Sequence, residues 1–131
     1  MFGRLKEQFN RRLKQEIEGT CETLLDVGCG PNSPIQYLSP RLRYTVGIDA
    51  FAPAIERSRA LGIHDEYYSI DALKIGAYFH PRSFDCVLAS DLLEHLNEQD
   101  GLNLISQMEK IARKKVIIFT PNGFLTQGVY Y

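Results

Sequence analysis

The sequence predicts a single α/β domain, built on a doubly wound, mostly parallel sheet of about five strands with helices on both faces. Short apolar runs alternate along the chain with segments of helical periodicity. Most of these runs lack the polar alternation of a half-exposed strand, which is typical of strands covered on both faces. The 131 residues are enough for one core, and no linker or repeat divides them, so we expect one domain over residues 1–131.

The first expected element is an amphipathic helix within residues 1–19. Its apolar residues, at steps of three and four, are Phe2, Leu5, Phe9, Leu13 and Ile17. The basic residues between them would suit a membrane surface or RNA, but Glu7, Glu16 and Glu18 dilute that charge. We therefore expect this helix to cover one flank of a sheet core that spans residues 23–124.

Five apolar runs are the expected strands. They lie at residues 21–29, 43–50, 65–73, 84–90 and 114–121. Residues 51–61 are expected to form a helix, with Pro53 tolerated in its first turn. A further helix is expected to begin near Asn97, and the residues that mark its buried face are Leu104, Ile105, Met108, Ile111 and Ala112.

Acidic residues close three of the expected strands: Asp26, Asp49 and Asp71. In open parallel sheets, ligands bind outside the carboxyl ends of the strands, where the strand order reverses. A single acid at such a position is as often a helix cap or a turn former. Three in succession are better explained by a binding rim, so we expect a ligand site along this edge.

A glycine turn at residues 28–30 follows the first strand and lets a ligand approach the backbone without interference from Cβ atoms. Asp49 lies about 20 residues further on, the spacing expected of a carboxylate that holds a ribose diol. A dinucleotide fold would have a third glycine where Ser33 stands, and Asp26 would repel a pyrophosphate. We therefore expect an adenosine ligand whose tail carries an ammonium or sulfonium group.

Four segments resemble, in order and spacing, the motifs of class I S-adenosylmethionine-dependent methyltransferases. They are LLDVGCGPNS, VGIDAF, IDAL and FDCVLASDLLEHL. The resemblance runs from about residue 23 to residue 124, and the ordered set is more specific than its first motif alone. It implies a Rossmann-like fold and S-adenosylmethionine or S-adenosylhomocysteine as the cofactor. It also implies methyl transfer to an acceptor, a small molecule in preference to RNA or protein.

The same resemblance implies three groups of cofactor-binding residues. Those that would line the methionine half are Asp26, Gly28, Cys29 and Gly30. Those that would hold the ribose and the adenine are Asp49, Ala50, Phe51, Asp71 and Ala72. Those that would flank the methyl donor are Ala89 and Ser90. Phe51 has a second interpretation as an ordinary core residue.

Methyl transfer from a sulfonium is an in-line displacement at a carbon that is already activated. Positioning the acceptor and excluding water can therefore suffice, and no catalytic residue is required. If a base is needed, Asp91 and His95 are the candidates, because histidine titrates near neutral pH and both follow the fourth strand. A histidine at such a turn is more often structural. The three cysteines have no metal-like spacing, so we expect no metal site.

The resemblance is incomplete at the C-terminal side. The family fold has seven strands and this chain ends soon after the fifth, which predicts a truncated domain with a bare, apolar edge strand. Another segment, or a second copy in a homodimer, would then pair with that edge. Because much of the acceptor surface would be missing, the alternative function is a non-catalytic S-adenosylmethionine-binding fragment or module.

Composition and sequence pattern disfavour several other classes of protein. With 44% hydrophobic residues, 24% charged residues and a net charge of −1, the sequence carries no strong nucleic-acid signal. No apolar run reaches the roughly 18 residues of a membrane span, and no signal peptide opens the chain. Three cysteines favour reduced thiols and a cytoplasmic protein over disulfides. Asp26 and Ser33 disfavour a nicotinamide-dependent oxidoreductase.

Overall fold

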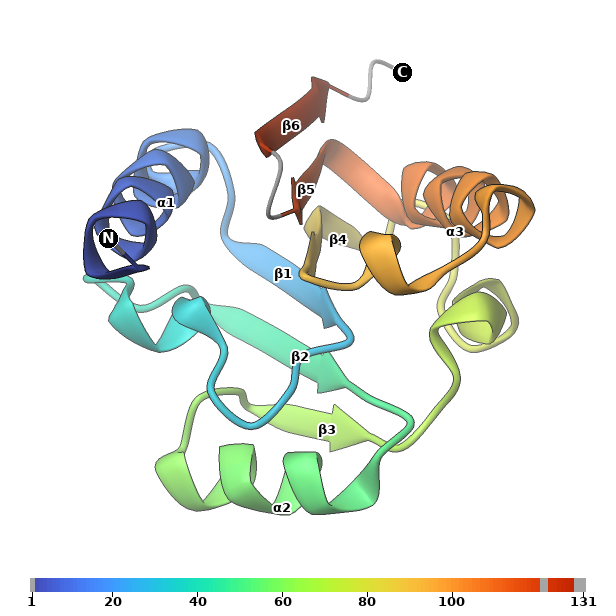
Figure 1. Ribbon diagram of the computed structural model, residues 1–131, viewed down its shortest axis with the longest axis horizontal. Helices are drawn as coiled ribbons and strands as arrows, with labels where there is room; N and C mark the ends of the chain where they lie inside the picture. Colours follow the sequence, from blue (N-terminus) through green and yellow to red (C-terminus); the bar gives the residue numbers. More distant parts are fainter. Residues whose placement is uncertain (1, 121–122, 129–131) are drawn as a thin grey trace.

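A six-stranded sheet crosses the molecule in the order β3-β2-β1-β4-β5-β6 (Figure 1). The computed structural model describes residues 2–120 and 123–128, with side chains for residues 7–120. The strands are β1 (Thr23–Val27), β2 (Tyr44–Ile48), β3 (Glu66–Tyr68), β4 (Phe84–Ser90), β5 (Ala112–Thr120) and β6 (Gly123–Gly128). All neighbours pair in parallel except β5 and β6. The predicted doubly wound, mostly parallel α/β fold is confirmed.

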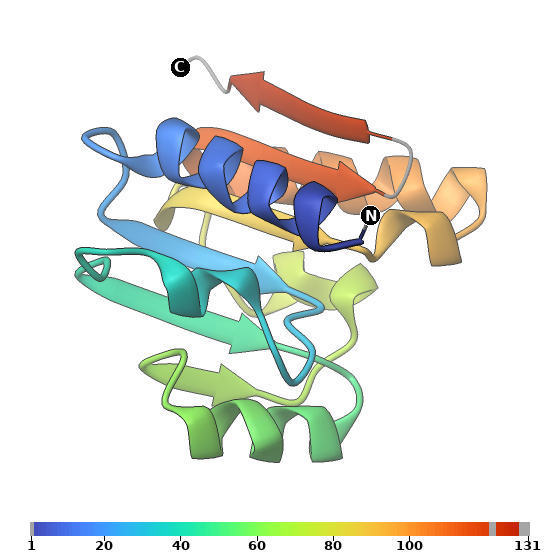
Figure 2. The ribbon, with the colours of Figure 1, turned by 60° about the vertical axis from the view of Figure 1, so that its left-hand side comes forward.

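Helices cover both faces of the sheet (Figure 2). The elements on one face are α1 (Phe2–Ile17), the 3-10 helix η1 (Pro34–Tyr37) and α2 (Ala52–Leu61). Those on the other face are the 3-10 helices η2 (Ala72–Ala77) and η3 (Leu93–His95) and the helix α3 (Glu98–Ile111). The predicted start of α3 is confirmed, because Asn97 caps it by accepting a hydrogen bond from the Asp100 N–H at 2.8 Å.

The apolar side of α1 packs on the sheet as predicted. Phe9, Leu13 and Ile17 are buried together with residues of β1, β4 and β5. Lys115 of β5 holds the last turn, since its Nζ lies 3.0 Å from the Glu16 carboxylate and donates to the Glu16 carbonyl at 2.6 Å. Phe2 and Leu5 belong to the residues whose side chains are outside the described part of the chain.

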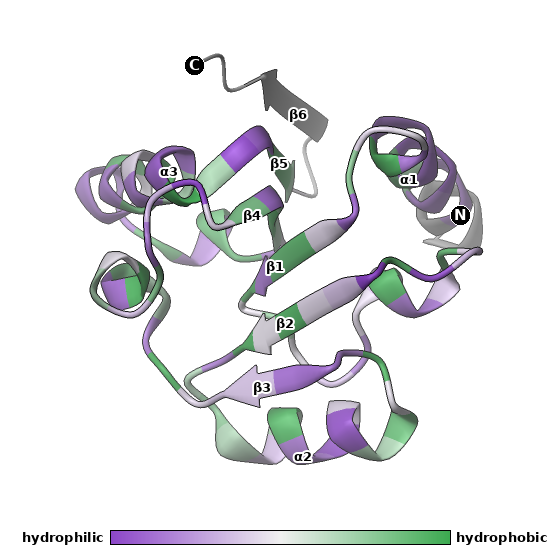
Figure 3. Ribbon diagram, turned by 180° about the vertical axis from the view of Figure 1, so that it is seen from behind, coloured by the Kyte–Doolittle hydropathy of each residue, from purple (hydrophilic) through white to green (hydrophobic). Residues whose placement is uncertain are grey.

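A second core lies on the opposite face, beneath α3. Leu104, Met108 and Ile111 of this helix are buried against strand residues such as Val27 and Val87. Figure 3 shows hydrophilic and hydrophobic residues mixed along α3 and along the coloured part of α1, as expected of helices that bury one side only. The strands between them, β1 and β4, are buried on both faces, as is typical of a parallel sheet covered by helices on both sides. Because β1, β2, β3, β4 and β5 all run in the same direction, their carboxyl ends lie at one edge of the sheet.

The third strand is shorter than predicted. β3 ends at Tyr68, and Asp71 instead caps η2 by accepting a hydrogen bond from the Leu73 N–H at 2.9 Å. The expectation that Asp71 closes a strand is therefore wrong. The reason is that β3 is an edge strand in which Tyr67 alone is buried, so the local capping preference decides where the next element begins.

The fifth strand does not form the bare edge that was expected. β6 pairs with β5 in antiparallel register from Lys115↔Gly128 to Thr120↔Gly123. A segment of the same chain therefore covers the apolar strand, and a second copy is not needed to cover it. The expected bare edge is therefore wrong, and of the two partners considered for β5, another segment or a second copy, the one that pairs with it is a segment of the same chain. Tyr130 and Tyr131, at the end of the sequence, lie outside the described residues.

Candidate functional site

The candidate site lies where the order of the strands reverses. The chain runs outward from β1 to β2 and β3 and then returns to the other side of β1 as β4. The loops after β1 and β4 meet at this point, because a Cβ atom added to Gly28 would lie 3.2 Å from Cδ2 of Leu92. Ligands of open parallel sheets bind at such a switch point.

The glycine turn after β1 has the backbone that its sequence requires. Gly28 and Gly30 have φ values of 68° and 62°, in the left-handed region that favours glycine. Among the described residues, no heavy atom outside the turn lies within 4 Å of a Cβ built on Gly30. This open space above the turn would be taken by any larger residue, so it fits the close approach of a ligand.

Asp49 joins this turn to the end of β2. Its Oδ2 accepts a hydrogen bond from the Gly30 N–H at 2.9 Å, and its Oδ1 accepts one from the Phe51 N–H at 2.8 Å. A carboxylate has about four lone-pair positions, so each oxygen can accept from one further donor. The side chain of Phe51 is 64% exposed beside the also exposed Ala50. The interpretation of Phe51 as a core residue is therefore wrong.

Asp26 lies beneath the turn rather than at its surface, and only 1% of the residue is exposed. Its Oδ2 accepts hydrogen bonds from the Ser33 hydroxyl at 2.5 Å and from Nε2 of His64 at 3.0 Å. An ionised carboxylate can only accept, so both partners act as donors. The Asp26 carboxylate is thus held by groups of the protein itself, and its negative charge lies under the glycine turn.

Two other predicted residues have buried side chains. Cys29 packs with Ile55 and Tyr67, and its N–H donates to the Ile48 carbonyl at 2.8 Å. Burial raises the pKa of the Cys29 thiol, and the charges of nearby carboxylates raise it further, so the sulfur stays protonated. Ala89 is fully buried within β4. Cys29 can therefore face a ligand through little besides its backbone, and Ala89 is packed behind the surface with no exposed atom.

The remaining predicted cofactor residues lie at the edges of this group. Ser90 is half-buried at the last position of β4. Asp71 is exposed, and its hydrogen bond belongs to its own helix, η2. Ala72 packs against the core beneath α3. The structure thus joins the glycine turn to Asp49 directly, but it does not join Asp71 to that unit.

Asp91 and His95 follow β4 and differ in their surroundings. Asp91 has a φ of 58°, unusual for a residue other than glycine, and its N–H donates to the Phe119 carbonyl at 3.0 Å. Desolvation raises the pKa of the Asp91 carboxyl, and the charge of Glu94 adds to this effect. The side chain of His95 is 73% exposed, with Nε2 3.8 Å from Glu94. Unusual backbone and a raised pKa both favour Asp91 as a functional residue.

The sequence interpretation did not identify His64 and Thr45, which are part of the buried group around Asp26. The Nδ1 atom of His64 lies 2.8 Å from the Thr45 hydroxyl, and its Nε2 atom contacts Asp26. A signal was present in Gly47, an isolated glycine inside a strand, which indicates close approach by another group. A Cβ at Gly47 would lie 2.6 Å from Cδ2 of His64.

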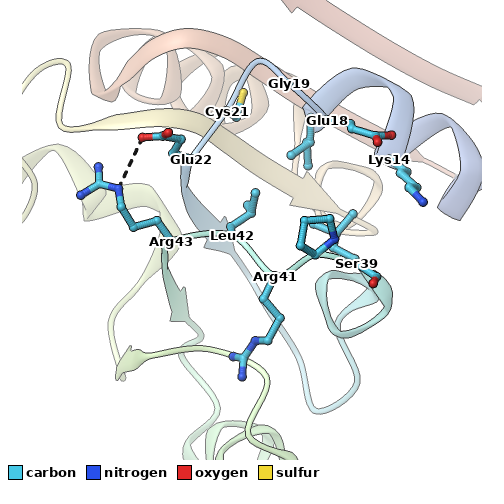
Figure 4. A pocket seen from close by; sticks show the side chains of 12 residues that line it. Lys14, Glu18, Gly19, Cys21, Glu22, Ser39, Arg41, Leu42 and Arg43 are labelled. Atoms are coloured by element: carbon cyan, nitrogen blue, oxygen red, sulfur yellow. Dashed lines mark ion pairs between the residues drawn. The ribbon is translucent and has the colours of Figure 1, made fainter.

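A separate cavity of about 300 Å³ lies at the opposite edge of the sheet (Figure 4). Residues from the end of α1 and from the segments that precede β1 and β2 line it, among them Lys14, Cys21, Arg41 and Arg43. An ion pair of 3.4 Å joins Arg43 to Glu22 at its rim. This cavity is at the amino ends of the strands and does not belong to the candidate site.

The described part of the chain lacks two further features. No helix there is long and apolar enough to cross a membrane. No group of three histidine, cysteine, aspartate or glutamate side chains gathers there in a way that could hold a metal ion.

A doubly wound sheet with a glycine turn and a carboxylate at its switch point is the arrangement typical of nucleotide-binding proteins of the α/β class. Within that class the chain belongs to the methyltransferase domain family, which it matches over residues 25–120. The sequence resemblance to class I S-adenosylmethionine-dependent methyltransferases is thus confirmed. No curated protein is similar enough in sequence to match.

Solved structures of methyltransferases share the fold. An S-adenosylmethionine-dependent methyltransferase from Archaeoglobus fulgidus is 22% identical with a TM-score of 0.67, over 86% of this chain and 51% of that one. The N-methyltransferase NodS from Bradyrhizobium japonicum is 20% identical with a TM-score of 0.71, over 89% and 67%. Magnesium protoporphyrin IX methyltransferase from Synechocystis, solved with bound S-adenosylmethionine, is 17% identical with a TM-score of 0.71, over 93% and 60%. This chain spans about half the length of the Archaeoglobus protein.

Proposed function

We propose that this chain binds S-adenosylmethionine at the carboxyl ends of β1, β2 and β4 and transfers its methyl group to a small molecule. The observation that carries the proposal is the 2.9 Å hydrogen bond from the Gly30 N–H to Asp49, which makes the glycine turn and the acid one unit. Membership of the methyltransferase domain family supports the choice of this cofactor over a dinucleotide.

The residues of the edge fit the parts of the cofactor. Asp49 has one acceptor position left on each oxygen, which matches the two hydroxyls of a ribose. Exposed Phe51 and Ala50 offer an apolar surface for adenine, and Asp71 can accept from the adenine amino group with its second oxygen. Beside them, Ala72 contributes apolar contact.

The glycine turn would hold the methionine half. The backbone of Gly28, Cys29 and Gly30 would line the tail, and the charge of Asp26 beneath it favours an ammonium group. Ser90 would flank the sulfonium, with Ala89 packed directly behind it. The sulfonium supplies an electrophilic methyl group when the cofactor is bound.

The chain's own contribution to the reaction is mainly to position the two reactants and to exclude water. Asp91 ranks ahead of His95 as a base for acceptors that must lose a proton. Both residues are exposed, and Asp91 is the one with the unusual backbone and the raised pKa. The pH dependence of methyl transfer in Asp91→Asn and His95→Gln variants would decide between them.

We also propose that the protein works in a reducing, cytoplasmic compartment. Such a compartment suits three buried cysteines that remain free thiols.

The alternative function is that of a module that binds S-adenosylmethionine without transferring its methyl group. Both functions need the same glycine turn and the same acid, so the site itself does not separate them. Methyl transfer to any of a panel of small amines, phenols and carboxylates would exclude that alternative.

The binding site can be tested by calorimetric titration with S-adenosylhomocysteine. We expect micromolar binding that weakens about tenfold or more in Asp49→Ala, a change of roughly 1.4 kcal/mol. The control is Glu98→Ala, which removes an exposed acid of α3 and should bind like the unchanged chain. A folded sample that fails to bind, or in which NAD competes equally well, would contradict the proposal.

A further inference from the structure

A buried chain of hydrogen bonds lies beneath the glycine turn. It runs from the Thr45 hydroxyl to Nδ1 of His64 (2.8 Å), from Nε2 of His64 to Asp26 (3.0 Å), and from Asp26 to the Ser33 hydroxyl (2.5 Å). None of these four residues is more than 6% exposed. Polar groups buried to this degree are costly unless each finds a partner, so the members of the chain hold one another in place.

The four side chains come from four separate segments. Asp26 belongs to β1 and Thr45 to β2, while His64 lies in the connection between α2 and β3. Ser33 ends the segment that begins with the glycine turn, and its oxygen accepts the Ile35 N–H at 3.3 Å at the start of η1. The network therefore attaches the far end of the turn segment to the sheet.

The ring of His64 has little freedom to move. It lies on the backbone of β2 at Gly47, where a Cβ atom would be 2.6 Å from its Cδ2. The backbone N–H of His64 donates to the Tyr67 hydroxyl at 2.9 Å, and that hydroxyl also lies 2.7 Å from the Ser58 hydroxyl. Both nitrogens and the backbone of His64 are thus engaged, so the direction of its bond to Asp26 is determined by the surrounding structure.

From this arrangement we infer that His64 is a positioning residue of the cofactor site. It holds the Asp26 carboxylate, and through Asp26 it holds Ser33 and the turn, in the shape that accepts a tail bearing an ammonium group. The inference rests on the proposed function and deepens it. His64 acts on the amino-acid half of the ligand, whereas Asp49 acts on the ribose.

Two ligands separate these halves: S-adenosylhomocysteine carries the amino-acid tail, and 5′-methylthioadenosine lacks it. We expect His64→Leu to weaken S-adenosylhomocysteine about tenfold or more, as for loss of a hydrogen bond to a charged group, and to leave 5′-methylthioadenosine within about twofold. His64→Gln, whose amide can donate to Asp26, should recover most of the loss. The matched control is His80→Leu, at an exposed histidine, which should change neither affinity.

The outcomes are distinguishable. Equal weakening of both ligands in His64→Leu would mean a merely structural role and overturn the inference. Unchanged binding of S-adenosylhomocysteine in His64→Leu would overturn it while leaving the proposed function intact. If neither ligand binds the unchanged chain, both proposals fail. If His64→Leu does not fold, Thr45→Val provides a second test, because it removes the hydrogen-bond partner of Nδ1. This variant should weaken S-adenosylhomocysteine more than 5′-methylthioadenosine, by a smaller factor than expected for His64→Leu. Equal effects on the two ligands would overturn the inference.

Discussion

Asp26 and Asp49 end neighbouring strands and have opposite surroundings. Asp26 is enclosed, with Ser33 and His64 on one oxygen, whereas Asp49 is half-buried and receives one backbone N–H on each oxygen. The side chain is the same, and the environment decides what it can offer. Asp49 keeps acceptor positions for a ligand at the edge, and Asp26 offers a charge from below.

A single methyl group at Gly47 would test how closely the His64 ring packs against β2. Its replacement by alanine would bring a Cβ to 2.6 Å from the His64 ring, so we expect Gly47→Ala to cost about 1–3 kcal/mol of unfolding free energy. The control is Gly101→Ala in α3, where the nearest outside atom, of Leu93, would be an ordinary 3.4 Å away. That change should be neutral or stabilise by about 0.5–1 kcal/mol. Urea unfolding measures both, and equal stability of the two variants would contradict the close packing of His64.

At the same scale, the sequence could predict the residues at strand ends but not those that meet across the fold. Asp49 and the glycine turn are visible because each directly follows an apolar run. His64 contacts Asp26 across 38 positions, and that contact depends on how α2 returns to the sheet. Gly47 was the local sign of a close neighbour, and it did not say which residue would fill the space.

At the scale of the elements, the helix α3 packs on the sheet through one of its faces only. Leu104 is fully buried and Leu102, two positions earlier, is 58% exposed. We expect Leu104→Ala to lower the unfolding free energy by about 2–5 kcal/mol, because it removes buried apolar contacts and leaves a cavity. Leu102→Ala, the same change on the outer side, should stay within about 0.5 kcal/mol. Thermal and urea unfolding of the pair would check this, and similar losses in both would mean that α3 packs by a different side.

Periodicity predicted the two long helices well, and it failed at the end of one edge strand and at the whole of the other. α1 and α3 have apolar faces sustained over several turns, which no competing local preference overrides. β3 is only three residues long and lies at an edge, so the capping preference of Asp71 determined the boundary instead. β6 begins and ends with glycine, a composition that favours turns over strands, and its pairing with β5 could not be predicted from periodicity.

For the molecule as a whole, low pH should weaken the interactions of Asp85, which connects the amino ends of β1, β4 and β5. Burial alone would raise the pKa of Asp85, but hydrogen bonds from the N–H groups of Glu22 and Thr23 and the charges of Lys114 and Arg113 outweigh it, and the pKa is lowered. A lowered pKa in the folded state means that Asp85 contributes stability above the unfolded value of about 3.9. That contribution is lost as the pH falls through the folded value.

Urea midpoints between pH 6 and pH 3 would test this for the unchanged chain and for Asp85→Asn. The variant should be less stable at pH 6 by about 1–3 kcal/mol, because a hydrogen-bonded charge is gone, and it should lose less on acidification. The hydrogen bond from Lys115 lowers the pKa of Glu16 as well. Glu16 therefore also contributes stability that is lost in acid, so the Asp85→Asn variant should keep some pH dependence. Parallel pH curves would show that Asp85 makes no such contribution.

The order of the strands also bears on how the chain comes together. β1, β2 and β3 follow one another in sequence and in space, so the half that contains the glycine turn, Asp49 and His64 forms from neighbouring segments. β4 reaches β1 only through partners such as Thr23 and Asp85, which are 62 residues apart. Closing so long a loop costs more entropy than any pairing among the first three strands. The switch point is therefore complete only after this late return, so we expect a chain emerging from the ribosome to hold its glycine turn and Asp49 in place before β4 closes the site beside them.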